Sequence, residues 1–178
     1  HTHIDRDILY IDGTKYEAYA NKMTFVWKKA TDKFYARNWA KAINVIRELN
    51  TYFNERNVDI HYSILKKPNF LYLLKITDKL EDYIKAKGIR FAHGKGKRKT
   101  ELQRLYERIA DCAMKMMKYE IHYDLFQGRN SFSKTDPDAA FLHMKYDYYN
   151  HTNVFKPGYN VQMGVMDGYI MNILINTE

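Results

Sequence analysis

The chain has 178 residues, of which 46% are hydrophobic and 28% are charged, a composition typical of one soluble globular domain with a sizeable core. No apolar run approaches the roughly 20 residues of a membrane span, and the first seven residues lack the apolar core of a signal peptide. A single cysteine, Cys112, excludes an internal disulfide and fits a reducing cytoplasm.

The net charge is +8 and is unevenly distributed along the chain. Between Trp27 and Asn130 there are 23 Lys and Arg against 12 Asp and Glu, whereas the two ends together hold 6 against 9. A basic middle between acidic ends favours an anionic partner, nucleic acid first. A set of solvated helix faces is the alternative interpretation.

The first predicted element is a short strand that carries an acidic residue. The apolar run Ile8–Ile11 leads directly into Asp12, and Gly13-Thr14 follows. This pattern predicts a buried strand that delivers a carboxylate to its C-terminal edge, where α/β folds place chemistry. An Asp before Gly is also common as a turn residue or a cap. Residues 22–27 alternate loosely and predict a second, antiparallel strand.

Three helices follow, because apolar residues recur at steps of three to five positions. We expect them at about 31–57, from Pro68 to Lys87, and at 100–126. Between the second and third lies a glycine-spaced loop without apolar residues, whose basic side chains are the candidate DNA contacts: Lys95, Lys97, Arg98 and Lys99.

From Gln127 the periodicity lapses, and two β-rich runs end the chain. They are 159–165 and 169–175, and an Asp167-Gly168 pair between them predicts a hairpin. The predicted order is therefore one or two strands, three helices and two strands.

Three phrases of the sequence carry a resemblance when they are taken together. They are Ile11 to Lys28 (IDGTKYEAYANKMTFVWK), Arg129 to Ala139 (RNSFSKTDPDA) and Phe155 to Gln162 (FKPGYNVQ). In this order and spacing, the chain resembles bacterial insertion-sequence transposases of the DDE (Asp-Asp-Glu) superfamily, which have an RNase H-like catalytic domain. The resemblance covers nearly the whole chain.

The resemblance implies an α/β fold, namely a partial RNase H-like mixed sheet with an all-helical insertion between early and late strands. The implied divisions are a first-strand region at 1–28, a basic helical insertion at 29–130 and later core strands at 131–178. Asp12 would be the first acid of the triad and a Mg²⁺ ligand. In such transposases the second Asp and the Glu lie downstream of the phrase FKPGYNVQ, and this chain stops before them. We therefore interpret it as a fragment.

The parent reaction would be Mg²⁺-dependent cleavage and strand transfer at transposon ends, through two ions that clamp the attacking and leaving oxygens. One carboxylate is too few for a two-metal site, so the fragment alone is expected to be inactive. The partners implied are transposon-end and target DNA, with no membrane and with a homodimer of the full-length parent. The implied location is the cytoplasm of a bacterium, in association with the nucleoid.

Other candidate residues have a structural interpretation that we prefer. Asp136, Asp138 and Asp167 favour turns, and Glu17 is expected to face solvent. The tract Tyr146–Tyr149 favours packing or a loop over base stacking. Cys112 is expected to be a small core residue, and the seven histidines lack metal-ligand spacing. Two rival functions stay open: a non-catalytic DNA-binding remnant and an unrelated basic helical interaction protein.

Overall fold

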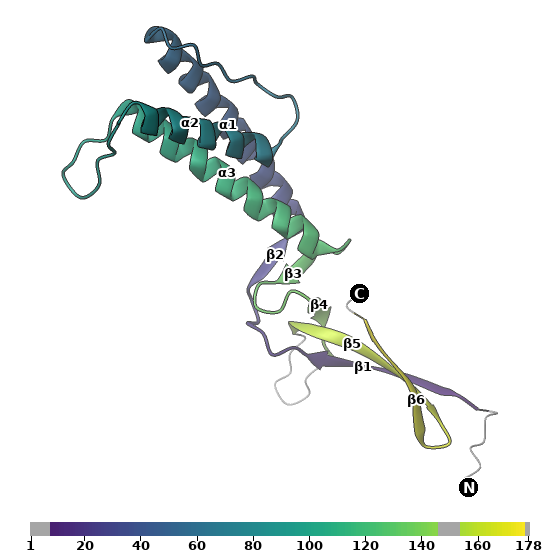
Figure 1. Ribbon diagram of the computed structural model, residues 1–178. Coiled ribbons are helices and arrows are strands. Elements are labelled where there is room, and N and C mark those ends of the chain that lie inside the picture. Colours follow the sequence, from purple (N-terminus) through teal and green to yellow (C-terminus); the bar gives the residue numbers. More distant parts are fainter. Residues whose placement is uncertain (1–7, 146–153, 177–178) are drawn as a thin grey trace. The chain divides into compact units, whose positions relative to one another are not determined.

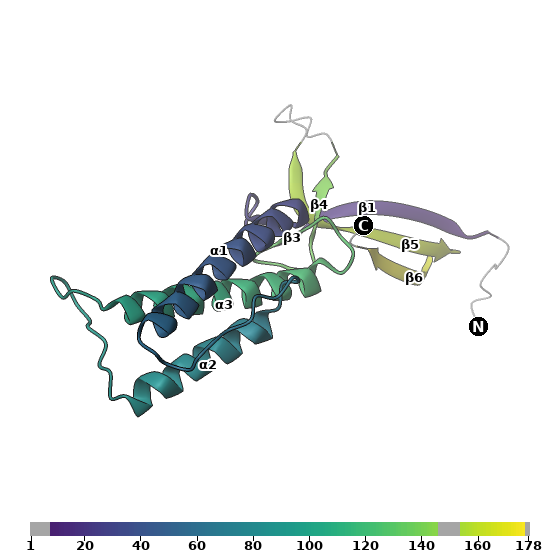
Figure 2. The same ribbon diagram turned by 90° about the horizontal axis from the view of Figure 1, so that it is seen from above.

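The computed structural model describes residues 8–145 and 154–176 and has a mixed α/β architecture, with three helices and antiparallel sheets (Figures 1 and 2). The chain divides into two compact units. A helical unit spans Ala30–Tyr123, and a strand unit combines His1–Lys29 with Asp124–Glu178. The predicted division into a first-strand region, an insertion and later strands stays a prediction.

The helical unit contains α1 (Lys28–Glu55), α2 (Phe70–Ala86) and α3 (Glu101–Phe126). The predicted helices therefore exist, with ends shifted by a few residues. Asn69 caps α2, because its side-chain oxygen accepts a hydrogen bond from the backbone N–H of Tyr72. The hydroxyl of Thr100 plays the same role for α3 and accepts from the backbone N–H of Gln103 at 3.2 Å.

The three helices enclose one apolar core. It is formed by residues at helical spacing on each helix, together with Tyr62 from the segment between α1 and α2. Cys112 is fully buried in this core, as its small apolar neighbours predict. The fully buried large side chains are Val45, Ile46, Leu49, Phe53, Leu73, Ile76, Leu80, Leu102, Ile109 and Met116.

Polar pairs along α1 and α3 show that these two helices run antiparallel. Tyr123 donates to Asp32 at 2.7 Å near one end, and Tyr35 donates to Glu120 at 2.7 Å one turn along. Further ion pairs continue this register: as the residue number rises along α1, the number of its partner on α3 falls. These pairs are Lys41 with Asp111, Glu48 with Arg108, and Arg56 with Glu101. The first and last turns of the helical unit therefore lie together.

In the strand unit, one sheet is built around the long strand β5 (Phe155–Met166). β1 (Tyr10–Glu17) pairs antiparallel with β5, which also pairs with β4 (Ala140–His143) and with β6 (Tyr169–Asn176). The predicted hairpin between the last two strands is confirmed. Its turn residues Asp167 and Gly168 both have positive φ, 48° and 77°, as a tight two-residue hairpin requires.

A second, two-stranded sheet pairs β2 (Phe25–Trp27) with β3 (Ser131–Ser133). We predicted the strand at β2, but β3 and β4 lie in a stretch whose pattern predicts no strand. Both are only three or four residues long, too short for a visible alternation. Tertiary pairing rather than local pattern makes them strands.

The prediction that Asp12 ends a buried strand is wrong in two respects. Asp12 lies inside β1, because Gly13 and Thr14 continue the pairing with Gln162 and Val161 of β5 instead of forming a turn. The strand is also exposed. Ile11 is 71% accessible among the described residues, because no other layer of that part of the chain covers β1.

Close packing explains one glycine of this sheet. A Cβ atom added at Gly158 would lie 2.5 Å from the carbonyl oxygen of Tyr16 on β1. Only glycine permits this approach of two backbones. The Gly in the phrase FKPGYNVQ therefore has a structural reason at the point where β1, β4 and β5 meet.

We predict that Leu49→Ala lowers the free energy of unfolding of the helical unit by about 2–5 kcal/mol, because it leaves a cavity in a fully buried position. Chemical denaturation followed by helical circular dichroism measures this loss. The matched control is Leu71→Ala on α2, an exposed leucine whose removal should change stability by less than about 0.5 kcal/mol. Equal losses in the two variants would contradict the core described above.

Candidate functional site

Asp12 lies in the third position of β1 and is exposed to solvent. Its Oδ1 accepts a hydrogen bond of 2.8 Å from the backbone N–H of Gly13, so the carboxylate folds back on its own strand. Across the sheet Asp12 is opposite Met163 of β5, which is opposite Ile173 of β6. Because directly opposite residues of neighbouring strands point to the same side of a sheet, these three share one face.

That face is rich in apolar residues that remain accessible. Alternation places Val161, Val165 and Ile175 on the same face as Asp12. All of β6 is exposed, and so is nearly all of β1. The carboxylate therefore stands in an open, largely apolar surface rather than in an enclosed pocket.

The described residues do not form a complete metal centre around Asp12. They contain no group of three or more His, Cys, Asp or Glu side chains that could hold a metal ion. Asp12 supplies one hard oxygen ligand, whereas a two-metal site needs several carboxylates that bridge and flank the ions. The described residues alone do not fit a pair of Mg²⁺ ions.

Asp136, one of the discounted metal ligands, is already engaged. The hydroxyl of Tyr159 donates to its Oδ2 at 2.6 Å. Burial and the neighbouring Asp136 carboxylate together raise the pKa of Tyr159 to about 12, so this hydroxyl keeps its proton at neutral pH. The backbone N–H of Ala139 also donates to the Asp136 carbonyl oxygen, as in a turn.

Arg129 holds the same turn from the other side. Its guanidinium donates to four backbone carbonyl oxygens, at 2.7–3.2 Å, and thereby ties the end of α3 to the Asp-Pro-Asp turn. The acceptors are the carbonyls of Leu125, Phe126, Pro137 and Asp138. The phrase RNSFSKTDPDA thus builds a strand and a braced turn.

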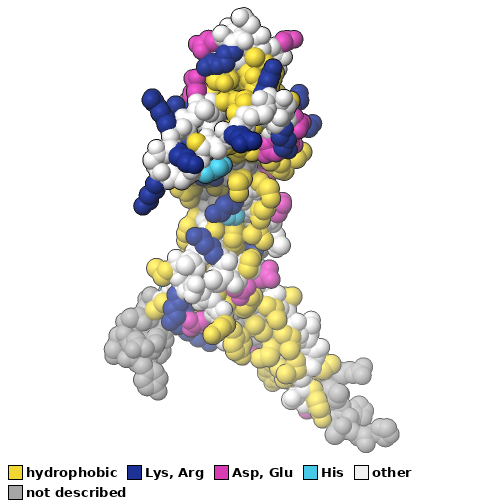
Figure 3. Space-filling view, turned by 60° about the vertical axis from the view of Figure 1, so that its left-hand side comes forward, with side chains coloured by type: hydrophobic (Ala, Val, Ile, Leu, Met, Phe, Trp, Pro, Cys, Tyr) yellow, Lys and Arg dark blue, Asp and Glu magenta, His cyan; other side chains and the backbone are white. Residues whose placement is uncertain are grey.

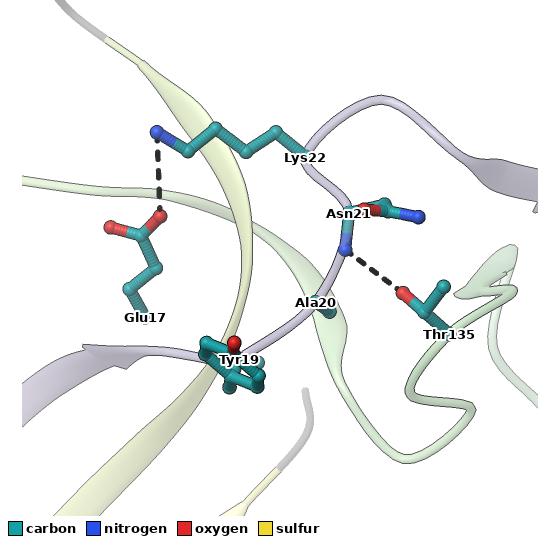
Figure 4. Close-up of a pocket in the computed structure, with 7 residues that line it drawn as sticks. Glu17, Tyr19, Ala20, Asn21, Lys22 and Thr135 are labelled. Carbon is teal, nitrogen blue, oxygen red and sulfur yellow. Dashed lines mark hydrogen bonds and ion pairs between the residues drawn. The ribbon is translucent and has the colours of Figure 1, made fainter.

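A hollow next to the end of β1 is lined by residues 17–22 and Thr135 (Figure 4). Glu17 lies between two ammonium groups, Lys156 at 2.5 Å and Lys22 at 3.8 Å. The hydrogen bond from Lys156 lowers the pKa of Glu17. On the other side, the backbone N–H of Asn21 donates to Thr135 Oγ1 at 2.9 Å. Glu17 is exposed, as expected, and its carboxylate is ion-paired with these two lysines.

The predicted DNA-binding loop lies between α2 and α3, and its four cations are not equivalent. Gly94 and Gly96 have positive φ, 100° and 80°, which shape the turn. Lys99 forms an ion pair of 2.6 Å with Glu107, and this pair lowers the pKa of Glu107. Lys95, Lys97 and Arg98 are exposed and have no ion pair within the described residues. They are the free cations of the loop.

Gln103 anchors this loop, a role that the sequence did not reveal. It is fully buried, and its amide accepts from the backbone N–H of Ala92 and donates to the carbonyl of the same residue, both at 2.9 Å. A further hydrogen bond of 3.0 Å reaches Glu107. The ring of Phe91 packs on Tyr106, with centroids 5.4 Å apart. In the sequence, the only trace of this anchor is a polar residue, Gln103, at a position next to the apolar face of α3.

Positive charge is concentrated on the helical unit. Residues 30–123 contain 20 Lys and Arg against 11 Asp and Glu, a net charge of +9. In Figure 3 many Lys and Arg side chains, in dark blue, gather over the helices, and apolar side chains, in yellow, form patches on the strands. The tract Tyr146–Tyr149 lies outside the described residues.

The chain matches no family model, no curated protein and no solved structure. None of the described helices has the length and apolarity that crossing a membrane requires. A functional assignment therefore depends on the sequence phrases and on the geometry given above.

We predict that Gln103→Ala frees the base of the basic loop. The variant loses both hydrogen bonds to Ala92, so hydrogen exchange at that amide should accelerate and the free energy of unfolding should fall by about 1–3 kcal/mol. Exchange measured by mass spectrometry or NMR tests this. Arg104→Ala, an exposed neighbour on α3, is the control that should leave both quantities unchanged. Unaltered exchange at Ala92 in the Gln103 variant would contradict the anchor.

Proposed function

We propose that this chain is part of a DDE transposase and contributes the first strand, the helical insertion and the next two strands of an RNase H-like catalytic domain. The main sequence support is the three phrases IDGTKYEAYANKMTFVWK, RNSFSKTDPDA and FKPGYNVQ in this order. The parent enzyme would cleave DNA at transposon ends and transfer the strands into target DNA, and a homodimer of that parent would act in association with the nucleoid.

The pairing of distant strands is the structural observation that carries this proposal. β1 precedes the helices and β5 and β6 follow them, yet they join as β1–β5–β6 in one antiparallel sheet. An RNase H-like domain with a helical insertion requires such an arrangement, with the first acid on the first strand. This proposal assigns that role to Asp12, the third residue of β1.

In the parent, Asp12 would hold Mg²⁺ together with further acids, which the described residues do not bring together with it. Two such ions would stabilise the charge on the attacking and leaving oxygens of an in-line phosphodiester displacement. The protein's contribution from this chain is a carboxylate on a paired strand, which fixes its position better than a loop would. By itself the chain should neither nick nor transfer DNA.

A non-catalytic DNA-binding remnant is the second candidate. Two observations favour it: the described residues contain no group of three or more His, Cys, Asp or Glu side chains that could hold a metal ion, and the helical unit has a net charge of +9. Both candidates require DNA binding through the basic loop, but only the transposase requires Asp12. The two predictions below separate these requirements.

The first prediction concerns chemistry. In a full-length transposase that contains this chain, Asp12→Asn keeps the side-chain volume but removes the charge that holds the metal, so cleavage of transposon-end DNA should fall by several orders of magnitude while DNA binding persists. Glu17→Gln is the matched control on the same strand and should keep cleavage within about tenfold. Cleavage above about a tenth of the original rate in the Asp12 variant would refute its catalytic role.

The second prediction concerns binding by the loop. Replacing Lys95, Lys97 and Arg98 with Ala should reduce the slope of log affinity against log salt for duplex DNA by up to about 3 units, because each phosphate contact contributes about 0.9. The loss should be similar for unrelated sequences, since backbone contacts carry no sequence information. Lys99→Ala should change the slope less, because Glu107 already neutralises that charge.

A charge-matched control replaces three exposed lysines of the helical unit that form no ion pair with other described residues, namely Lys75, Lys79 and Lys118. Its salt slope should change by less than about 1 unit. An equal change in both triple variants would indicate diffuse attraction by net charge, and an unchanged slope in the loop variant would make the loop a solvated segment without a partner.

A further inference from the structure

A shallow hollow in the strand unit combines aromatic and polar side chains that neither the triad nor the basic loop uses. It is lined by the end of β2, the segment before β3 and the strand β4. Trp27 and Phe141 contribute its aromatic wall, and Arg129 and Asn130 contribute its polar groups. All four belong to the same compact unit.

The aromatic wall is part of a row of rings that crosses both sheets. The Trp27 ring meets Phe141 edge to face, with centroids 5.3 Å apart, and Phe141 stacks on Phe155 at 4.9 Å with an interplanar angle of 11°. Trp27 is 44% exposed and Phe155 is 48% exposed. Phe141 thus supports Trp27 from inside, while a large part of the indole remains open.

The polar side of the hollow suits a ligand that has both a negative charge and hydrogen-bonding groups. The Arg129 guanidinium is fixed in position by its four carbonyl contacts. Asn130 is exposed, and its side-chain amide has no hydrogen bond within the described residues, although its backbone oxygen accepts from Lys28 N–H at 2.9 Å. No Asp or Glu lines the hollow.

We propose that this hollow binds one unpaired nucleobase of single-stranded DNA, with the base stacked on Trp27, its edge hydrogen-bonded by Asn130 and its phosphate attracted by Arg129. A base–aromatic stack, an amide at the base edge and a nearby cation are the elements that proteins combine at unpaired bases. This inference rests on the proposed DNA-binding function and adds a preference for unpaired bases to it.

The site favours unpaired over paired DNA for a geometric reason. In a duplex both faces of a base are covered by its neighbours, so no face is free for the indole. An unpaired base can turn out of the strand and place one face on Trp27. The basic loop, by contrast, should bind duplex and single strands through their phosphates.

Tryptophan fluorescence of the wild-type chain provides the direct test. The chain has two tryptophans, and Trp39 is only 6% exposed in the core of the helical unit, so quenching by added DNA reports on Trp27. The probes are a 12-nucleotide single strand of mixed sequence and a blunt hairpin duplex with the same bases. We expect saturable quenching with the single strand and little quenching with the duplex.

Two variants test the stacking on Trp27 and the hydrogen bonding by Asn130 separately. Trp27→Ala should weaken single-strand binding about tenfold and change duplex binding less than twofold, since one base–aromatic stack is lost. Asn130→Asp keeps the shape of the side chain but replaces the NH2 donor with a second oxygen acceptor and adds a negative charge. It should therefore weaken single-strand binding several-fold. Phe34→Ala removes a ring 48% exposed on α1 and is the matched control.

The outcomes distinguish this inference from the proposed function. If DNA binds with a salt slope that depends on Lys95, Lys97 and Arg98 but the indole is not quenched, the hollow is not a base site and the DNA-binding proposal stands. If Trp27→Ala weakens duplex and single-strand binding equally, the base site is also refuted. Binding of neither DNA by a folded chain would overturn the proposed function itself. Thermal melting confirms that each variant is folded.

Discussion

The antiparallel register of α1 and α3 is the constraint on which the rest of the structure depends. An apolar core joins the two helices, and a series of polar pairs from Asp32–Tyr123 to Arg56–Glu101 fixes how they align. Most of these pairs are exposed and contribute little individually. Together they define one register, which brings the two ends of the helical unit together at one extremity and presents the loop between α2 and α3 near the other.

That register has a consequence for the strands that flank the helices. Because α1 begins where α3 ends, the strands before and after the helical unit can pair directly, as β2 does with β3. The backbone of Lys28 donates to Asn130 at 2.9 Å at this junction. A helical segment of about a hundred residues can therefore occur between β1 and β5 without preventing their pairing. The proposed DNA contacts of the basic loop belong to the helical unit, whereas Asp12 and the hollow beside Trp27 belong to the strand unit.

Three acidic residues of the strand unit, which were candidate metal ligands, differ in the partners that their carboxylates have. Glu17 is neutralised by Lys156 and Lys22, and Asp136 accepts the Tyr159 hydroxyl. Asp12 contacts only the backbone N–H of its neighbour Gly13 and no cation within the described residues. A metal at this carboxylate would therefore displace no ion pair of the described residues, although the surface around it is open and apolar. In globular domains such an apolar face packs against another layer.

The sequence by itself determined the three helices and the hairpin at Asp167-Gly168, because both depend on local signals: a period of 3.6 with capping residues, and a pair that tolerates positive φ. It also singled out the basic loop and Asp12. Only the tertiary structure decided that Asp12 lies within a strand, since the partner strand β5 extends past it, and that Lys99 is paired while its three neighbours are not. Short strands such as β3, the anchor Gln103 and the hollow beside Trp27 depend on contacts between residues far apart in sequence, which no local pattern encodes.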